Sequence, residues 1–257
     1  MFGAILSPLA FLTVHVAFPD NVSAHEQIVL RWLHFAGGTV WLGLLYFFIL
    51  VNTPFLKELE AGTRAKVFSV LMPRAMWWFR WASVVTWLAG FRYFMILMKD
   101  DATNVGNPGL FGKWMGMWFG VWLVAYVLIH GFLMMSEGPF KNGWVLAVAV
   151  AVVVKAASWA VLYLMSDPAA GNRTLSIAVG GGLGTIMFLN VWGMVWRCQK
   201  RLIAWHQASV AQGTPLPPEA ALLARRVYLA ARVNFWLSFP LLFFMAASAH
   251  YPFLSGR

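Results

Sequence analysis

Residues 143–165, GWVLAVAVAVVVKAASWAVLYLM, decide the fold class. A helix needs about 20 predominantly apolar residues to cross a hydrocarbon core about 30 Å thick, and this run meets that length with one charged residue, Lys155. A transmembrane β-strand needs only about 9–11 residues, roughly half of the run. The run therefore predicts a transmembrane helix.

The same apolar character extends along the whole chain. Of 257 residues, 61% are hydrophobic and 11% are charged, whereas a soluble domain has about 25% charged residues. Soluble enzymes, nucleic-acid binders and disulfide scaffolds are therefore poor interpretations, and the single cysteine permits neither an internal disulfide nor a Cys-x-x-Cys-His haem attachment site. We expect an all-α, polytopic transmembrane bundle with six spans: 28–51, 75–98, 114–135, 143–165, 174–196 and 227–249.

The first 18 residues are also apolar and end at Pro19-Asp20-Asn21. They lack the basic start of a secretory signal. A short seventh helix or a membrane-surface helix is expected there. We treat residues 1–257 as one integral-membrane domain, with residues 1–24 as an apolar extension.

The net charge of +10 is distributed unevenly over the loops. The first, third and fifth loops carry ten basic residues: Lys57, Arg64, Lys66, Arg74, Lys141, Arg197, Lys200, Arg201, Arg225 and Arg226. The opposite side carries four: Lys99, Lys113, Arg173 and Arg257. With the acidic residues included, the two sides carry +6 and −1. Short basic loops stay cytoplasmic, so we expect a multi-pass protein of a bacterial cytoplasmic membrane with a periplasmic C-terminus and no nucleic-acid partner.

Five charged residues fall inside the predicted spans: Arg31, Arg80, Arg92, Lys155 and Arg232. Arg92 and Arg232 lie near span ends and can extend their charges to the interface. Lys155 lies near mid-span, where an ionised group costs about 2.5–3.5 kcal/mol, and no predicted span has a carboxylate at that depth. Lys155 therefore has a functional role, or it faces a neighbouring subunit or a wet crevice.

Histidines gather toward the expected outer face, and His34 has the most informative surroundings. Gly37 and Gly38, three and four residues on, share its helix face and leave the surface beside the imidazole bare. A flat macrocycle could lie there with the imidazole as axial ligand, and Arg31 could pair with a propionate. Close helix packing is the competing explanation for the glycines.

A second axial ligand must come from the same membrane level. His250 at the outer end of the last span is the best candidate, whereas His130 lies at a different depth. The predicted haem b site comprises His34 and His250 as metal ligands with Arg31, Gly37, Gly38 and Arg92 around the ring.

The third span repeats two residue types at intervals of four. Gly112, Gly116 and Gly120 form a strip suited to close helix contact. Trp114, Trp118, Trp122, Tyr126 and His130 form a stripe that drifts about 160° in all, so it is expected to spiral around the helix. Such aromatic surface could also contact chlorophyll, a carotenoid or a quinone. The glycines of residues 180–184 favour helix packing over a phosphate loop.

Short motifs in order along the chain resemble a known family. They are RWLH at 31–34, WFRW at 78–81, TWLAG at 86–90, GTIM at 184–187, FPL at 239–241 and HYP at 250–252. Together they resemble the membrane domain of the cytochrome-c-linked, membrane-bound urate oxidases (urate hydroxylases). The resemblance covers residues 25–257 as a urate-oxidase-like membrane domain.

The resemblance implies urate oxidation in the membrane domain and electron transfer to a C-terminal cytochrome c. Because the chain stops just after the last predicted span, that cytochrome is expected to be a separate chain. The second-span motif of the family reads Trp-Phe-Lys-Trp-Glu, but Arg80 replaces the lysine and Ala82 replaces the glutamate, which removes an acid–base group. Ala249 replaces an asparagine before the final His-Tyr-Pro.

Three functional hypotheses follow. In the first, the chain is a membrane subunit of a respiratory or photosynthetic electron-transfer complex, with haem b near the periplasmic face, other membrane subunits around it and a periplasmic cytochrome c as redox partner. In the second, it is a non-catalytic scaffold of such a complex. In the third, it oxidises urate and uses a separate cytochrome c.

Overall fold

A computed structural model describes residues 18–135, 138–166 and 170–254. The predicted N-terminal helix lies outside these residues. The described residues form helices and turns and contain no strand, which confirms the all-α prediction. The elements are α1 (Val22–Tyr46), η2 (Phe47–Asn52), α2 (Thr53–Glu58), α3 (Ala61–Asn104), α4 (Leu110–Met134), η3 (Gly138–Lys141), α5 (Gly143–Met165), α6 (Asn172–Asn190), η4 (Val191–Val195), α7 (Trp196–Gln212) and α8 (Ala220–His250).

Six continuous helices in the described part of the chain are long and apolar enough to cross a membrane, as predicted. Several are longer than the sequence indicated, because α1, η2 and α2 join into Val22–Glu58, and α6, η4 and α7 join into Asn172–Gln212. The second of these is 41 residues long, or about 62 Å at 1.5 Å per residue. Hydropathy marks only the apolar part of such a helix, whereas its backbone hydrogen bonding continues into the polar region outside the bilayer.

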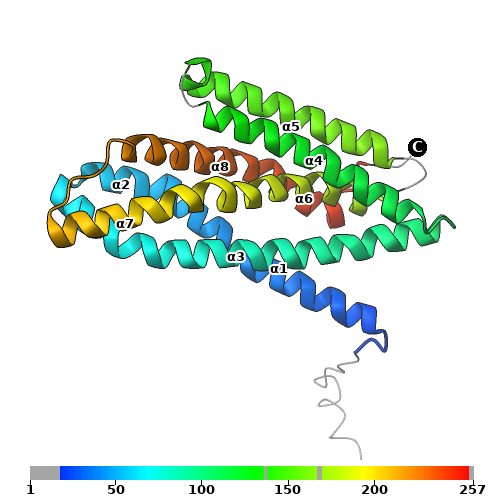
Figure 1. Cartoon of the computed structure of the whole chain (residues 1–257). Coiled ribbons are helices and arrows are strands. Elements are labelled where there is room, and N and C mark those ends of the chain that lie inside the picture. Colours follow the sequence, from blue (N-terminus) through cyan, green and yellow to red (C-terminus); the bar gives the residue numbers. More distant parts are fainter. Residues whose placement is uncertain (1–17, 136–137, 167–169, 255–257) are drawn as a thin grey trace, which may run out of the picture.

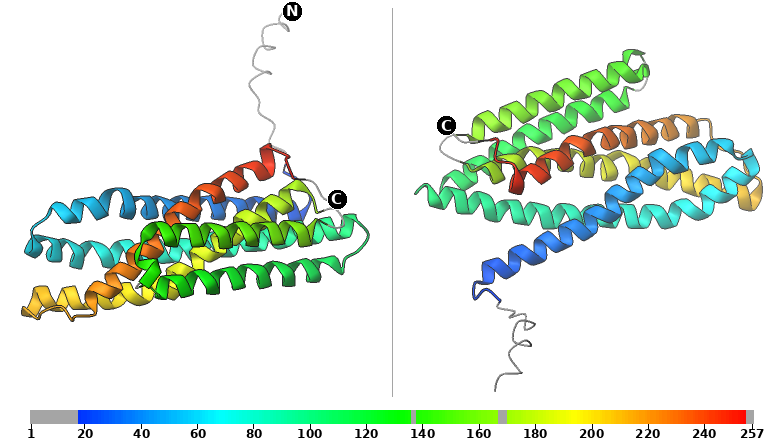
Figure 2. Two further views of the ribbon diagram at one scale, coloured as in Figure 1. Left: turned by 90° about the horizontal axis from the view of Figure 1, so that it is seen from above. Right: turned by 180° about the vertical axis from the view of Figure 1, so that it is seen from behind.

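The helices are arranged around α6, whose residues are mostly buried (Figure 1). α8 packs along α6, α1 packs along α3, and α4 pairs with α5. Figure 1 and Figure 2 show α4 and α5 side by side at one edge of the bundle, and α1 beside α3 at the opposite edge. Consequently α5 contacts the rest of the bundle along one side only.

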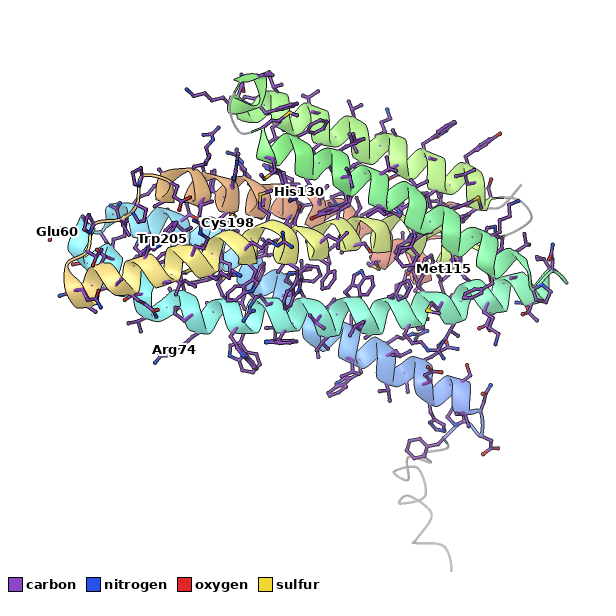
Figure 3. The ribbon with its side chains drawn as sticks, in the orientation of Figure 1. Glu60, Arg74, Met115, His130, Cys198 and Trp205 are labelled. Carbon is purple, nitrogen blue, oxygen red and sulfur yellow. The ribbon has the colours of Figure 1, made fainter. Side chains whose placement is uncertain are left out.

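The connections between helices sort to two ends. The α2–α3, α4–α5 and α7–α8 connections lie at one end, which we call the basic end. Figure 3 places Glu60, Arg74 and Trp205 toward this end and Met115 toward the other, which we call the His250 end. The three loops that the sequence identified as rich in basic residues therefore lie at the same end of the bundle.

Indole rings of α4 fill the space against α6. Trp114, Trp118 and Trp122 are at most 1% exposed, and the Nε1 atoms of Trp118 and Trp122 donate to the carbonyl oxygen of Ala178 at 2.8 and 3.2 Å. The prediction that the stripe spirals around the helix is wrong for these three rings, because two steps of four residues drift only about 80° and stay on the inner face.

The glycines of α4 and α6 have different roles. A Cβ on Gly112, Gly116 or Gly120 would meet nothing within 4 Å, so the predicted contact strip of α4 makes no close contact among the described residues. On Gly182 of α6, a Cβ would coincide with the indole of Trp122. The packing interpretation therefore holds for α6.

This difference predicts opposite responses to one added methyl group. Gly182→Ala is expected to lower the free energy of unfolding by about 1–3 kcal/mol, because Trp122 must move out of its place. Gly116→Ala is the matched control and is expected to be neutral or slightly stabilising, since alanine favours the helix. Thermal unfolding in detergent measures both; equal melting temperatures for the two variants would contradict the packing described for Gly182.

Candidate functional site

His34 lies on α1 and turns toward α3. Its Nδ1 atom is 2.8 Å from the carbonyl oxygen of Thr86. Because a carbonyl only accepts hydrogen bonds, Nδ1 carries the proton, and Nε2 is the atom with a free lone pair. No described residue donates a hydrogen bond to Nε2. Ligating histidines commonly hold their other nitrogen in this way.

A notch in α3 receives the imidazole. A Cβ on Gly90 would lie 2.5 Å from Nδ1 and 2.6 Å from Cε1 of His34. Only glycine therefore permits the ring to sit at this place. The Thr86 carbonyl and Gly90 together fix both the tautomer and the position of His34.

The two glycines beside His34 are in different environments. Gly37 is buried, and a Cβ there would lie 2.7 Å from Oγ1 of Thr86 and 3.2 Å from the carbonyl oxygen of Ala82. A Cβ on Gly38 would meet only Cγ2 of Thr86, at 3.7 Å. Gly37 thus serves close packing of α1 on α3, and the surface beside it is covered by protein.

Two contacts fasten the outer part of α1 to α3. The Nε and Nη2 atoms of Arg31 donate to the hydroxyl of Tyr93 at 3.1 and 3.0 Å. Nε of Arg92 lies 2.7 Å from a carboxylate oxygen of Glu26. Of the two arginines predicted near propionates, Arg92 already has a carboxylate partner, whereas Arg31 has only a neutral one.

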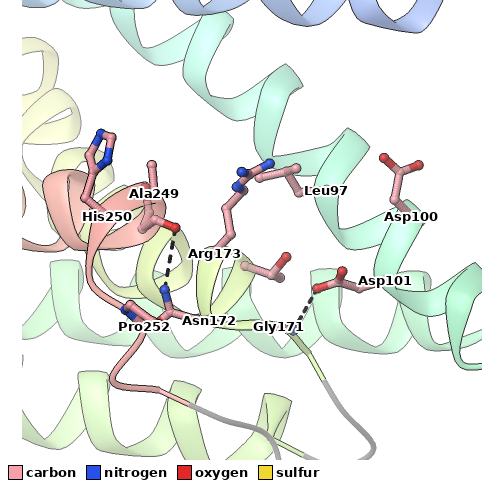
Figure 4. Close-up of a pocket in the computed structure, with 11 residues that line it drawn as sticks. Leu97, Asp100, Asp101, Gly171, Asn172, Arg173, Ala249, His250 and Pro252 are labelled. Carbon is pink, nitrogen blue, oxygen red and sulfur yellow. Dashed lines mark hydrogen bonds between the residues drawn. The ribbon is translucent and has the colours of Figure 1, made fainter.

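A cavity of about 490 Å³ opens at the His250 end (Figure 4). The end of α3, the start of α6 and the end of α8 line it, with Asp100, Asp101, Arg173, Ser248 and His250 among the polar residues. Its charged groups are therefore two carboxylates and one guanidinium, and His250 itself is exposed.

Asn172 and Asp101 hold this cavity together. Nδ2 of Asn172 donates to the carbonyl oxygen of Ala247 at 3.3 Å, and Oδ1 accepts the backbone N–H groups of Phe253 and Leu254 at 3.2 and 3.1 Å. Oδ2 of Asp101 accepts the N–H of Gly171 at 2.9 Å. These bonds join α3, α6 and the segment after α8.

The structure does not bring His34 and His250 together. His34 faces Gly90 of α3, whereas the cavity of His250 reaches α3 at Leu97 and Asp101. Seven residues of helix, from Gly90 to Leu97, correspond to about 10 Å along the axis. The two imidazoles therefore lie at different levels and have different surroundings.

Two of the remaining described histidines have hydrogen-bond partners nearby in the chain. Nδ1 of His130 lies 3.4 Å from the hydroxyl of Tyr126. Nδ1 of His206 lies 2.8 Å from the carbonyl oxygen of Leu202 on its own helix. His25 is exposed near the start of α1. Across the described residues, no group of three or more histidine, cysteine or acidic side chains is arranged to hold a metal ion.

Comparison with known proteins identifies the family. A sequence model described as urate oxidase N-terminal matches residues 21–257. The chain belongs to the urate oxidase N-terminal family. No curated protein and no solved structure matches it. The match covers all six spans and excludes most of the N-terminal apolar extension.

Arg80 and Ala82 lie on opposite sides of α3. The guanidinium of Arg80 stacks over the ring of Trp196, 3.4 Å from its centroid, and Nε donates to the carbonyl oxygen of Met76 at 3.2 Å. Ala82 is buried, and its carbonyl faces Gly37. Arg80 thus clamps α3 to α7, while position 82 lies within the α1–α3 contact, one turn of helix from Thr86.

The sequence singled out His34 and Arg31 as candidates but did not point to the residues that hold them. Thr86 acts through its backbone carbonyl, which every residue possesses, so no side-chain signal marks it. Gly90 and Tyr93 lie more than fifty residues away in the chain, and only the packing of α1 on α3 pairs them with α1. Gly90 does lie within the TWLAG motif, which was the available signal.

The notch predicts a thermodynamic coupling between positions 34 and 90. Gly90→Ala is expected to cost about 1–3 kcal/mol of unfolding free energy, because the new methyl displaces the imidazole. In a His34→Ala background the same substitution should cost much less, because the clashing ring is gone. A double-mutant cycle by thermal or denaturant unfolding measures this; an equal loss in both backgrounds would rule out the contact.

Proposed function

We propose that this chain is an integral-membrane subunit of an electron-transfer complex and binds a b-type haem through Nε2 of His34. The single observation that carries the proposal is the hydrogen bond from Nδ1 of His34 to the Thr86 carbonyl. It leaves Nε2 as the available nitrogen and holds the ring by a rigid backbone group. Membership of the urate oxidase N-terminal family supports a redox role.

The surroundings of His34 fit a haem in part. The covered face of Gly37 offers no room for a macrocycle, so the ring would have to approach Nε2 from the side away from α3. Arg31, one turn from His34, has no carboxylate partner among the described residues and is the better candidate for a propionate. When bound, the haem would supply one-electron chemistry. His34 would hold the haem, and Arg31 would neutralise the charge of a propionate.

The proposal extends to the redox partner, the orientation in the membrane and the role of His250. The partner would be a separate cytochrome c at the His250 end, which would face the periplasm of a bacterial cytoplasmic membrane; the excess of basic residues in the loops at the other end supports this orientation. His250 would be the second residue to hold the haem, although it lines a cavity about 10 Å farther along α3 than the position that His34 faces.

Absorption spectra of the purified protein test the haem. We expect a Soret band and a pyridine haemochrome of b type in the wild-type protein, and loss of both in His34→Ala. His206→Ala is the matched control, because His206 also bonds a backbone carbonyl through Nδ1 but lies at the basic end; it should retain the spectrum. Wild-type protein without haem, or haem retained in His34→Ala, would refute the assignment.

His250→Ala extends the same measurement to the second axial position. If His250 is a ligand, the variant should convert a low-spin spectrum into a high-spin one. An unchanged spectrum would show that His250 does not bind the haem.

Urate oxidation with a separate cytochrome c is the second candidate, and the cavity at the His250 end favours it. Urate is a planar purine with alternating N–H and C=O groups, so a site for it needs both donors and acceptors. Arg173 and His250 can donate to the oxygens, and Asp100 can accept from an N–H group. The description of the family, urate oxidase N-terminal, points to the same substrate.

Urate-dependent reduction of added cytochrome c tests this candidate. Arg173→Gln should raise KM for urate by about tenfold or more, because it removes a charged donor worth about 1.5–3 kcal/mol. Lys113→Gln is the control, since Lys113 is an exposed basic residue at the same end but does not line the cavity. If urate reduces no more cytochrome c than buffer does, urate oxidation is excluded. If the purified protein also lacks haem, the non-catalytic scaffold is the remaining hypothesis.

A further inference from the structure

The outward face of α5 has one charge at its middle. Lys155 is exposed, and no described residue forms an ion pair with it. The helix spans Gly143–Met165, so Lys155 lies about 18 Å from its start and about 15 Å from its end. A four-carbon stem does not reach an aqueous interface from that depth.

Helix geometry directs Lys155 away from the bundle. At 100° per residue, the buried Leu146 lies about 180° around the helix from Lys155, and the buried Ala157 about 200°. Most positions within about 60° of Lys155 are exposed: Trp144 (81%), Val148 (61%), Ala151, Val152 (62%) and Trp159 (67%). Ser158 and Leu162, on the same side of the helix, are half-buried. We call the five exposed residues and Lys155 the α5 outer face. Figure 2 shows that α5 lies at the edge of the bundle, with no helix outside it.

The other charged residues that the sequence places inside spans have partners. Arg80 stacks on Trp196, Arg92 pairs with Glu26, and Arg31 bonds Tyr93. Arg232 donates to Tyr228 at 3.3 Å. Within the described residues, Lys155 is therefore the exception, and it is also the one nearest mid-span.

A second copy of the chain cannot neutralise Lys155. All nine acidic residues lie in or near the connections between spans: Asp20, Glu26, Glu58, Glu60, Asp100, Asp101, Glu137, Asp167 and Glu219. Two copies joined through this face would bring two lysines together in hydrocarbon, where like charges repel strongly. The missing carboxylate must come from a different polypeptide.

We propose that the α5 outer face docks a transmembrane helix of another subunit, which carries an Asp or Glu at mid-membrane depth that pairs with Lys155. Charged residues inside membranes pair with one another because unpaired charges in hydrocarbon are costly. Ala151, one turn from Lys155, lets the partner backbone approach closely, and the two tryptophans cover its flanks. The proposal does not depend on haem binding or urate chemistry.

Photo-crosslinking in the native membrane tests the face. A photoreactive amino acid at Val148 is expected to form an adduct with a transmembrane segment of another protein, and mass spectrometry should find Asp or Glu near the middle of that segment. Lys155→Arg should retain the adduct, and Lys155→Met should reduce its yield at least tenfold. Lys113→Met, which removes an exposed lysine at a helix end, should leave the yield unchanged.

Three outcomes would overturn the proposal. They are an adduct only with a second copy of the chain, an adduct whose segment has no carboxylate, and an adduct of equal yield in Lys155→Met.

A reconstitution experiment tests the same pairing with the unmodified chain. The protein is placed in phosphatidylcholine vesicles with dansyl-labelled Leu/Ala transmembrane peptides that carry Glu, Gln or Leu at the centre. Energy transfer from tryptophan should show the Glu peptide binding about tenfold more tightly than the Leu peptide, with Gln between them. Equal binding of the three peptides, or loss of the preference only on Lys113→Met, would contradict the charge pairing.

Discussion

Close approach of side chains to the backbone of α6 holds the bundle together. In a bilayer the lipid tails are as apolar as the side chains, so helices associate through packing and hydrogen bonds rather than through hydrophobic burial. Gly182 makes room for the indole of Trp122, while Gly180 and Gly184 let Phe244 and Leu241 of α8 approach. The tryptophans of α4 then reach the Ala178 carbonyl. α4 and α8 thus meet one central helix.

Glycines also permit close approach of two helices at the edge of the bundle, where they shape the candidate site. Gly37 and Gly90 bring α1 and α3 close enough for His34 to bond the backbone of Thr86. A rigid backbone acceptor orients an imidazole more firmly than a mobile side chain does. Because Thr86 and Ala82 cover Gly37, the surface left for a ligand beside His34 is smaller than the bare face of Gly37 and Gly38 that the sequence indicated.

Several buried polar side chains join one helix to another. Asn190 and Asn234 bond each other at 2.9 Å, and Tyr46 bonds Ser238 at 2.9 Å, so these pairs fasten α8 to α6 and α1. Arg80 is likewise occupied, by Trp196. His34, Arg31 and Lys155 are not fully buried. Nε2 of His34 has no described donor, Arg31 bonds only a neutral hydroxyl, and Lys155 has no ion-pair partner among the described residues. These three residues are accordingly the ones assigned to ligand or partner contacts.

The sequence by itself determined the number of spans, the sorting of basic loops and the charged residues inside the membrane, because the bilayer imposes length and polarity on every segment separately. The length and apolar composition of residues 143–165 are enough to identify a transmembrane helix without knowledge of the helices around it. Tertiary structure alone decided which glycines pack, which tryptophans are buried, and where each histidine lies. Gly116 and Gly182 look alike in sequence but differ in what faces them. His34 and His250 share a predicted side of the membrane, yet His34 faces Gly90 while the cavity of His250 reaches α3 only at Leu97 and beyond, about 10 Å farther along that helix. Pairing across helices depends on register and rotation that no single span encodes.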